Sequence, residues 1–399
     1  MRWSPITRLV TGLLLLAGSP LMLAAGSAVD TRTAGDQETP VVARAASGAS
    51  VIVWSGPASQ RNLSEIFARR YDAQGNPVGP PIQVNQGVAL RQYQPSVAMA
   101  ADGSFAVVWA NGENGPGFKI TGRRFDANGN PLGPEFRIDP EGSTVIATGP
   151  DIAMNASGDA VVVWGTRRAV GGLADLDART IRGRTLSADG QLGRAFRAAF
   201  NFLPLLLSPH VGIAPDGDFA IVYRSDGSQK GTTGVYIRRY RANGRPYGAL
   251  PRRADRRLAA VDALNAPHIA FGADGSYAAA WTGYRGNNEP VSVFVRRFSA
   301  DGRAIGDPRQ IGDSLRQPSI AIDANNNLLL ATSNANIELR HIAPGGIISP
   351  VQTIEGSRPF HVLAPSVAVG GSNRALVTWQ DFGRDGDGRG VYARAVSGQ

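Results

Sequence analysis

Three residues whose side chains could do chemistry occupy equivalent places in the sequence. Asp151, His210 and His268 each follow directly after a proline. A carboxylate and two imidazoles brought together can coordinate a metal ion or act as general acid and base. The alternative interpretation is a polar lining that does no chemistry. Choosing between them requires the architecture that positions the three prolines.

The prolines belong to a sequence repeat with seven copies. In each copy a proline is followed fourteen residues later by one fixed position, which is aromatic in six copies. The pairs are Pro40/Trp54, Pro95/Trp109, Pro150/Trp164, Pro209/Tyr223, Pro267/Trp281, Pro318/Thr332 and Pro365/Trp379. Repeat units of this length cannot bury their own apolar faces, so they must pack on one another.

The second copy shows the composition of one unit. Residues 96–100 alternate as a strand should, and Asp102-Gly103 supplies a hairpin turn. Residues 105–109 are rich in strand-forming side chains, and further strands are expected at 118–125 and 135–138. Four short antiparallel strands in each unit are typical of a propeller blade. The sequence therefore predicts an all-β, seven-bladed β-propeller, with blades starting near residues 40, 95, 150, 209, 267, 318 and 365.

The two ends of the chain predict how the ring closes. The seventh copy reaches Gln399 after only three strands. Residues 29–39 have the spacing of a preceding fourth strand, so we expect the segment Ser27–Thr33 to pair with the strand that ends near Val396. This arrangement would remove the two free sheet edges of an open ring.

The first 28 residues have the composition of an export signal. Arg2 and Arg8 flank the start, residues 9–23 are apolar, and small residues follow from Ala24 to Ala28. We expect cleavage between residues 24 and 28 and a periplasmic or secreted protein that is a monomer. No second hydrophobic stretch follows, so no transmembrane segment is expected after removal of the signal. There is no cysteine, hence no disulfide framework.

The repeats resemble those of exported bacterial propeller-like proteins. The likeness is carried by Pro-Ser-Val-Ala at 95–98, Asp102-Gly103, Arg-Arg-Phe-Asp at 123–126 and Asn-Pro-Leu-Gly at 130–133. It covers nearly all of the chain after the signal. The resemblance implies the fold and no catalytic residue. The sixth copy departs from the pattern, because Thr332 replaces the aromatic residue.

One arginine recurs in every third strand. The seven residues are Arg70, Arg124, Arg184, Arg239, Arg297, Arg340 and Arg394. A ring of ligands is one interpretation. The favoured interpretation is architectural: each arginine serves its own blade by pairing with a carbonyl or an acid, or by stacking on the aromatic residue.

Two loops carry most of the local positive charge. The formal net charge is +9, almost all of it from arginine. Connections from strand two to three and from strand four to one are long and variable, and they meet on one face, where function is expected. The candidate ligand-binding residues on this variable face are Arg167, Arg168, Arg252, Arg253, Arg256 and Arg257. The alternative is a solvated arginine-rich surface.

The variable face is also where other candidates are predicted. If strand one is innermost, Asp151, His210 and His268 ring the mouth of the central channel there. His341 and His361 have no such placement. The apolar stretch 200–207 interrupts a connection that should be polar, and it is predicted to bury over the ring or contact a partner.

A calcium loop is a weaker candidate. Asp381, Asp385 and Asp387 stand at odd spacing among glycines, as in some calcium loops. The distal glutamate of an EF-hand is missing, and Asp-Gly pairs are also ordinary turn residues. No other cofactor is predicted.

These features favour a non-catalytic binding protein. Its expected partner is a protein or an acidic polysaccharide, engaged through the variable face; nucleic acid is a less natural partner for an exported chain. The alternative function is a hydrolase or lyase that acts on polysaccharide at the channel mouth through Asp151, His210 and His268. No glycosidase carboxylate pair or nucleophile motif is visible to support it.

Overall fold

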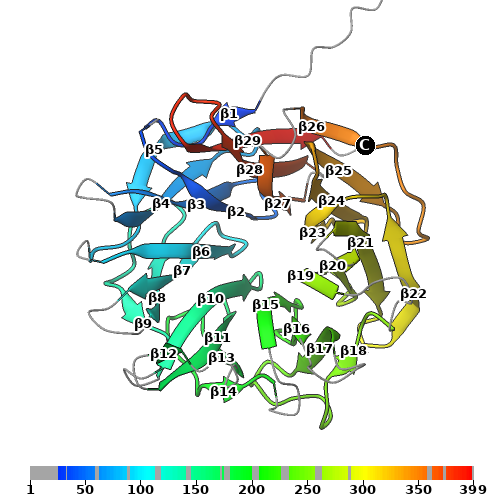
Figure 1. Ribbon diagram of the computed structural model, residues 1–399. Coiled ribbons are helices and arrows are strands. Elements are labelled where there is room, and N and C mark those ends of the chain that lie inside the picture. Colours follow the sequence, from blue (N-terminus) through cyan, green and yellow to red (C-terminus); the bar gives the residue numbers. More distant parts are fainter. Residues whose placement is uncertain are drawn as a thin grey trace, which may run out of the picture.

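Each repeat forms one antiparallel sheet, and the seven sheets surround a central axis (Figure 1). The computed structural model therefore confirms the predicted all-β, seven-bladed β-propeller. It describes residues 26–32, 34–58, 63–87, 90–112, 118–140, 145–170, 173–174, 180–199, 206–225, 233–256, 263–285, 289–356, 362–371 and 374–397. Among these residues no helix is long and apolar enough to cross a membrane. Residues 1–25, most of the predicted export signal, lie outside the described part.

The first four blades follow the chain from its N-terminal end. Blade 1 contains β2 (Glu38–Arg44), β3 (Ser50–Pro57), β4 (Ser64–Tyr71) and β5 (Pro77–Gln83). Blade 2 contains β6 (Gln92–Met99), β7 (Phe105–Gly112), β8 (Phe118–Phe125) and β9 (Phe136–Arg137). Blade 3 contains β10 (Val145–Met154), β11 (Ala160–Val170), β13 (Thr180–Leu186) and β14 (Phe196–Arg197), and β12 (Leu173–Ala174) extends β11. Blade 4 contains β15 (Leu206–Ile213), β16 (Phe219–Ser225), β17 (Gly234–Tyr240) and β18 (Arg252–Arg253).

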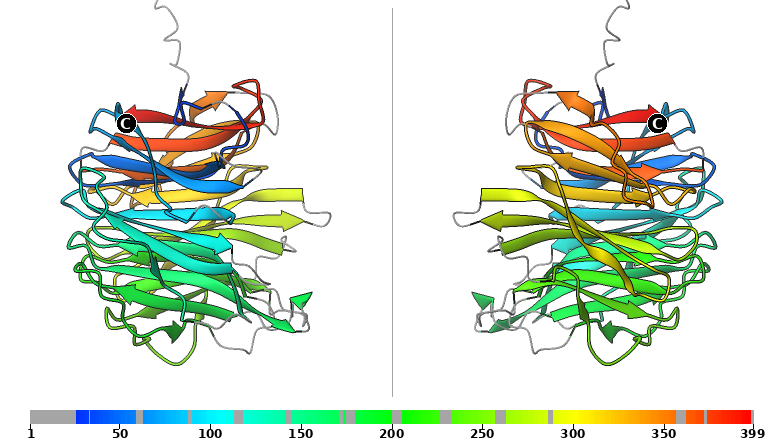
Figure 2. Two further views of the ribbon diagram at one scale, coloured as in Figure 1. Left: turned by 90° about the vertical axis from the view of Figure 1, so that its left-hand side faces the viewer. Right: turned by 90° about the vertical axis from the view of Figure 1, so that its right-hand side faces the viewer.

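The last three blades complete the ring. Blade 5 contains β19 (Ala263–Phe271), β20 (Tyr277–Arg285), β21 (Glu289–Phe298) and β22 (Ala304–Ile311). Blade 6 contains β23 (Arg316–Ile322), β24 (Leu328–Ser333), β25 (Asn336–Ile342) and β26 (Gln352–Gly356). Blade 7 contains β27 (Val362–Val369), β28 (Arg374–Phe382), β29 (Arg389–Ser397) and β1 (Ser27–Ala28). The side views show the blades stacked around the ring, with β20 and β21 extending beyond their neighbours on one face (Figure 2).

The N-terminal strand closes the ring, as predicted. Ser27 pairs with Ala393 and Ala28 with Tyr392, and the Val29 N–H donates to the Val391 carbonyl at 2.8 Å. Val29 is fully buried. Because β1 begins at residue 27, cleavage of the predicted signal after residue 24 or 25 would keep this strand, whereas cleavage after residue 28 would remove it.

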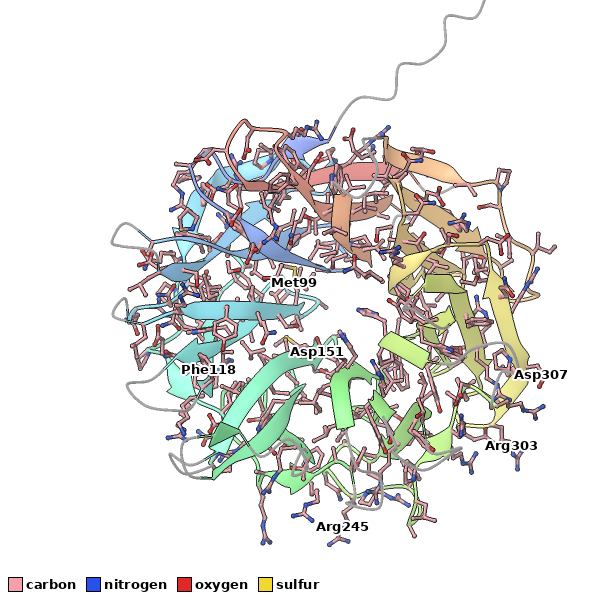
Figure 3. All side chains as sticks on the ribbon, in the orientation of Figure 1. Met99, Phe118, Asp151, Arg245, Arg303 and Asp307 are labelled. Carbon is pink, nitrogen blue, oxygen red and sulfur yellow. The ribbon has the colours of Figure 1, made fainter. Side chains whose placement is uncertain are left out.

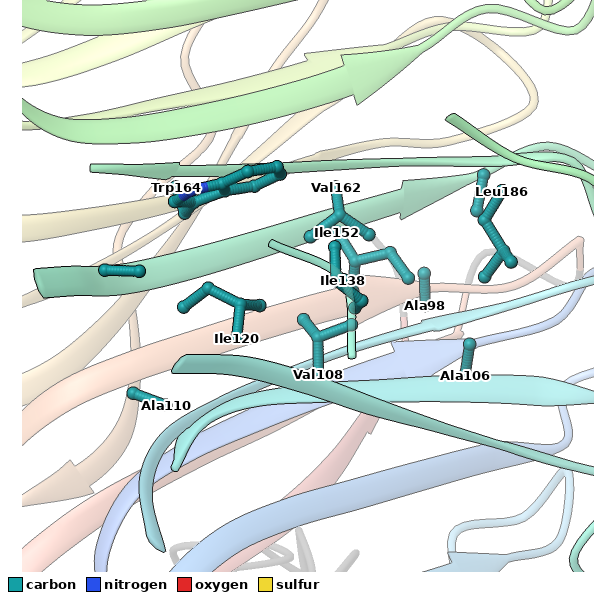
Figure 4. Close-up of a cluster of buried hydrophobic side chains, with 12 residues drawn as sticks. Ala98, Ala106, Val108, Ala110, Ile120, Ile138, Ile152, Val162, Trp164 and Leu186 are labelled. Carbon is teal, nitrogen blue, oxygen red and sulfur yellow. The ribbon is translucent and has the colours of Figure 1, made fainter. Parts of the chain in front are cut away.

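The core lies between blades rather than within them. Strand two of each blade is buried on both faces, because a neighbouring blade covers each face. In one such cluster Val108 and Ile120 of blade 2 pack against Ile152 and Trp164 of blade 3 (Figure 4). The five tryptophans of the repeat and Tyr223 are all fully buried, and so is Thr332, which takes their place in blade 6. The aromatic position is thus a scaffold position.

Arginines on strand three fasten each blade to its neighbours. Arg123 donates through Nη1 to the Val84 carbonyl of blade 1 at 2.9 Å, and Arg184 donates to the Ile138 carbonyl of blade 2 at 2.8 Å. On strand three these arginines pair with the strand-two residue that lies two positions before the aromatic position of the repeat. All seven blades have an arginine at this place on strand three. The seven are Arg69, Arg123, Arg184, Arg238, Arg296, Arg340 and Arg394.

A second register, one residue later, points to the opposite face of the blade. There Arg70 donates to the Ala127 carbonyl of the following blade at 2.8 Å, and Arg239 donates to Ala300 in the same way at 2.6 Å. The predicted set of seven mixed these two registers and was wrong in that respect. Carbonyl pairing is confirmed, but the arginines serve neighbouring blades as well as their own, because adjacent strand residues project to opposite sides.

Candidate functional site

Each inner strand contains a bulge at its repeat proline. In all seven blades the register of strands one and two shifts just before the residue that follows the proline, for example between Thr148 and Asp151. The residue before the proline has a positive φ in six blades: Thr39, Gln94, Gly149, Ser208, Gln317 and Ala364. Proline has no N–H to donate, so it is tolerated in a bulge. The bulge sets the direction of the side chain that follows.

The side chains after the prolines hold neighbouring blades together. Ser319 Oγ accepts a hydrogen bond from the backbone N–H of Val367 in the next blade at 3.2 Å. The other four such bonds are Ser96 to Ile152 at 3.4 Å, Asp151 to Val211 at 2.8 Å, His268 to Ile320 at 3.4 Å and Ser366 to Val42 at 3.2 Å. Five of seven positions therefore act as fasteners, a role that the sequence analysis missed. The polar residue directly after six of the seven repeat prolines was the available signal; Val41 follows the first.

His210 breaks this pattern. Its Nδ1 atom is buried, makes no hydrogen bond and lies 3.4 Å from Oδ2 of Asp151 in the preceding blade. Its ring contacts that of His268 in the following blade, with ring centroids 4.9 Å apart and planes at 41°. The structure thus brings Asp151, His210 and His268 together across three consecutive blades, as predicted. We call these three residues the channel site.

The channel site lies within the inner strands and not at their ends. Asp151, His210 and His268 are interior residues of β10, β15 and β19. Asp151 lies beside the central axis (Figure 3). The prediction that they ring the mouth of the channel was therefore wrong, because the proline bulge occurs part-way along each strand. A third of the His210 side chain remains exposed.

Asp151 is held as a carboxylate. Burial opposes its charge, but His210, the Val211 N–H and His268 together lower the pKa of the Asp151 carboxyl below its ordinary value. Its other oxygen, Oδ1, accepts a hydrogen bond from the Ser96 hydroxyl at 2.9 Å. Both oxygens are thus engaged, so Asp151 is suited to orient its neighbours.

The two imidazoles differ in their protons. Burial, together with the charge of His210, lowers the pKa of His268 to about 3, against the opposing effect of Asp151. His268 is therefore neutral near pH 7, and because Nδ1 accepts from Ile320, its proton is on Nε2. His210 Nδ1 faces the Asp151 carboxylate, so Nε2 is the ring nitrogen that can accept a hydrogen bond when Nδ1 carries the proton. The pair thus offers one N–H donor and one nitrogen acceptor.

The other predicted site residues are placed as follows. Arg253 bonds twice to Asp255, at 2.8 Å each, and Arg252 donates to the Gly302 carbonyl of blade 5 at 3.1 Å. Arg256 pairs with Asp307. These three arginines therefore already have partners. Arg257, the Arg167 and Arg168 side chains, the side chains of 200–207, and His361 lie outside what the structure describes.

The proposed calcium loop anchors the N-terminal segment. Asp387 Oδ2 accepts from the Gly35 N–H at 3.1 Å, and Asp385 accepts from the Asp387 N–H at 3.3 Å, while Asp381 is buried in β28. Within the described ranges no three His, Asp or Glu side chains are grouped so that they could hold a metal ion. His341 lies in β25, where burial lowers its pKa.

Comparison with known proteins supports the fold alone. No family model matches the chain, and no curated protein matches it in sequence. A protein of unknown function from Dyadobacter fermentans is similar in structure, with a TM-score of 0.57, 11% identity and coverage of 94% of this chain and 98% of that one. The α-L-arabinanase of Penicillium chrysogenum gives a TM-score of 0.53 at 11% identity, covering 93% and 98%. The polysaccharide lyase Uly1 gives 0.53 at 11% identity, covering 91% and 90%.

Proposed function

We propose that this protein binds a glycan at the channel site. The observation that carries the proposal is the contact of His210 with Asp151 and with His268 in the neighbouring blades, at a position that in five other blades makes an inter-blade hydrogen bond. Binding sites usually interrupt the symmetry of a repeat, because an architectural role is the same in every unit.

The chemistry of the pair suits a sugar. A hydroxyl group both donates and accepts hydrogen bonds, so one or two hydroxyls match the His268 Nε2–H and the His210 Nε2 lone pair. Asp151 fixes the orientation of His210 from behind. Two of the similar structures, an arabinanase and a polysaccharide lyase, act on carbohydrate by their names, which makes a glycan the first ligand to test.

A second candidate function is a polysaccharide-acting enzyme, a hydrolase or lyase. It is favoured by the contact between Asp151 and His210, because an imidazole oriented by a carboxylate is a general base. In a lyase, His210 Nε2 would take the proton from the carbon beside a uronic carboxylate. The electrons of that C–H bond would form a C=C bond, the C–O bond to the leaving sugar would break, and His268 Nε2–H would protonate the leaving oxygen.

Binding and turnover can be measured on the same proteins. We expect His210→Ala to weaken retention on a neutral polysaccharide such as arabinan about tenfold, the equivalent of about 1.4 kcal/mol. Ser319→Ala is the matched control, because it removes one fastener at the same position of blade 6 without touching an imidazole, and its retention should equal that of the wild type. Equal retention of wild type and His210→Ala would overturn the proposal.

The products formed distinguish an enzyme from a binding protein. New reducing ends, or the ultraviolet absorbance of an unsaturated uronate, would appear with wild type and disappear with His210→Ala. Retention without either product supports binding alone.

A further inference from the structure

Two pockets of the same design lie between neighbouring blades. The first, of about 240 Å³, lies between blades 4 and 5 and is lined by Arg238, Arg239, Tyr247, Leu250, Arg252 and Asp301 among others. The second, of about 200 Å³, lies between blades 5 and 6 and is lined by Arg296, Arg297, Ile305, Asp307, Arg309 and Gly346 among others. We call them the rim pockets. Neither contains a residue of the channel site.

The two pockets are built from equivalent residues, because neighbouring blades have the same arrangement of strands and turns. Each takes two consecutive arginines from strand three and one from strand four: Arg252 in the first pocket and Arg309 in the second. Each has an exposed apolar side chain at its lip, Leu250 at 67% exposure and Ile305 at 56%. The opposite wall is the turn between strands three and four of the next blade. The rim pockets are therefore on the face of the short turns, opposite the predicted variable face.

Positive charge exceeds negative charge in both pockets. Each is lined by three arginines and one aspartate. Asp301 is paired with Arg303 at 3.3 Å, and Asp307 is paired with Arg256, so both acids already have a partner outside the pocket. The guanidinium groups instead donate to neutral carbonyls: Arg239 to Ala300, Arg252 to Gly302 and Arg309 to Gly346.

Each of these bonds uses one guanidinium nitrogen, so Arg239, Arg252 and Arg309 have further N–H groups for a ligand. Arg238 and Arg296 are almost fully buried and belong to the architectural register. An arginine has five N–H donors in a planar fork that suits carboxylate and sulfate oxygens. Arg239 and Arg241 are also held by Tyr247, with both guanidinium carbons 4.7 Å from the ring centroid, so their positions are fixed before a ligand arrives. Burial lowers the pKa of Arg296 and of Arg297 in the second pocket, because it destabilises their positive charge. A bound anion would stabilise that charge.

We infer that the rim pockets bind successive acidic groups of one polysaccharide chain. The inference goes beyond the proposed function, because it assigns a second surface and an acidic, polymeric ligand. A carboxylate or sulfate would receive N–H bonds from the arginines, while the apolar face of the sugar ring packs on Leu250 or Ile305. Because the pockets are one blade apart, a chain that runs along the rim meets the same chemistry twice. Linked contacts of this kind raise affinity without any new type of bond.

Chain length is the first test. Acidic oligosaccharides of increasing length, one series carboxylated and one sulfated, are titrated calorimetrically into the full chain. Affinity should rise steeply at the length that spans both pockets, and salt should weaken it. The series that shows the rise identifies the acidic group. Affinity that does not depend on length would overturn the inference.

The second test removes the strand-four arginines. In Arg252→Gln combined with Arg309→Gln, the amide can still donate to Gly302 and Gly346 carbonyls, but the charge is lost. We expect the length-dependent rise to disappear, at least a tenfold loss for the long oligomer. Arg124→Gln is the matched control, because it alters an equivalent bond, to the Ala188 carbonyl, outside the rim pockets. It should bind as the wild type does. A double variant that binds as wild type overturns the inference.

The two proposals fail in different ways. If His210→Ala loses neutral polysaccharide while the arginine variants bind acidic oligomers normally, the rim inference is wrong and the channel proposal stands. If the arginine variants lose acidic oligomers while His210→Ala changes nothing, the channel proposal is wrong. If wild type retains neither kind of polysaccharide, both are wrong.

Discussion

The inner strands of blades 6 and 7 differ from those of blades 3 to 5 in a way that separates scaffold from site. In blades 6 and 7 the residue after the proline is an uncharged serine. Its hydroxyl accepts a hydrogen bond from one backbone N–H of the next blade. In blades 3 to 5 the same position holds Asp151, His210 and His268. Asp151 and His268 also hold the next blade, but His210 does not and instead contacts both of them. The same bulge thus supports two outcomes, and the residue type after the proline decides which one occurs.

The arginine registers make the same distinction on the outside of the ring. The register of Arg123 holds an arginine in every blade, and Arg123 itself donates to carbonyls of two blades, as an architectural residue should. In blade 6 Arg340 pairs instead with Glu338 of its own strand. In blades 4 and 5 strand four adds Arg252 and Arg309 to the pair on strand three, at a position that Phe136 and Phe196 occupy in blades 2 and 3. An arginine that recurs in every blade therefore has an architectural role. It can contribute to a binding site where a second arginine that does not recur lies next to it.

The largest effect is expected from breaking a repeated contact. Arg296 is almost fully buried and donates to the Ala254 carbonyl at 2.9 Å and to the Gly306 carbonyl at 3.0 Å. Arg296→Leu leaves both carbonyls without their donor, so we expect a loss of about 3 kcal/mol of unfolding free energy. Urea unfolding measures it. Arg303→Leu, which removes an exposed arginine paired only at the surface, should change stability by less than about 0.5 kcal/mol. Equal losses in both variants would show that the register is not architectural.

A smaller, pH-dependent effect is expected at the channel site. The pKa of His268 is about 3 in the folded protein, below its ordinary value of 6.5, so the unfolded chain takes up the proton first as the pH falls. The stability that His268 contributes is therefore full above pH 6.5 and is lost as the pH falls from 6.5 toward 3. Unfolding at a series of pH values measures this loss.

His268→Gln is the variant for that measurement. Its amide oxygen can still accept from the Ile320 N–H, but it does not titrate. We expect its stability to fall less between pH 6.5 and pH 3 than that of the wild type. Part of the fall should remain, because burial also lowers the pKa of His341. An unchanged pH profile would show that His268 is not held neutral.

The sequence repeat determined how much of the fold and of the channel site could be predicted. The seven repeat prolines, six of them followed fourteen residues later by an aromatic residue, predicted the number of blades, the strand order and the closure by residues 27 and 28, because regular spacing leaves one way to bury the apolar faces. The convergence of Asp151, His210 and His268 also followed from equivalent positions. Their depth did not, since it depends on where each strand bulges. The rim pockets did not either, because they join residues of adjacent blades, such as Arg252 and Gly302, whose contact depends on the angle between sheets.

The smallest effect is expected at the bulge, where blades 3 and 7 differ by a single methyl group. Gly149 in blade 3 and Ala364 in blade 7 precede the repeat proline with φ of 58° and 50°. Glycine adopts this conformation at little cost, whereas alanine is strained there. No atom lies within 4 Å of a Cβ added at Gly149, so Gly149→Ala tests the backbone alone. We expect it to lose about 1 kcal/mol and Ala364→Gly to gain a few tenths, since glycine also raises the entropy of the unfolded chain. Thermal unfolding resolves the two signs, and a gain in Gly149→Ala would mean that the positive φ is not needed to direct Asp151 toward His210.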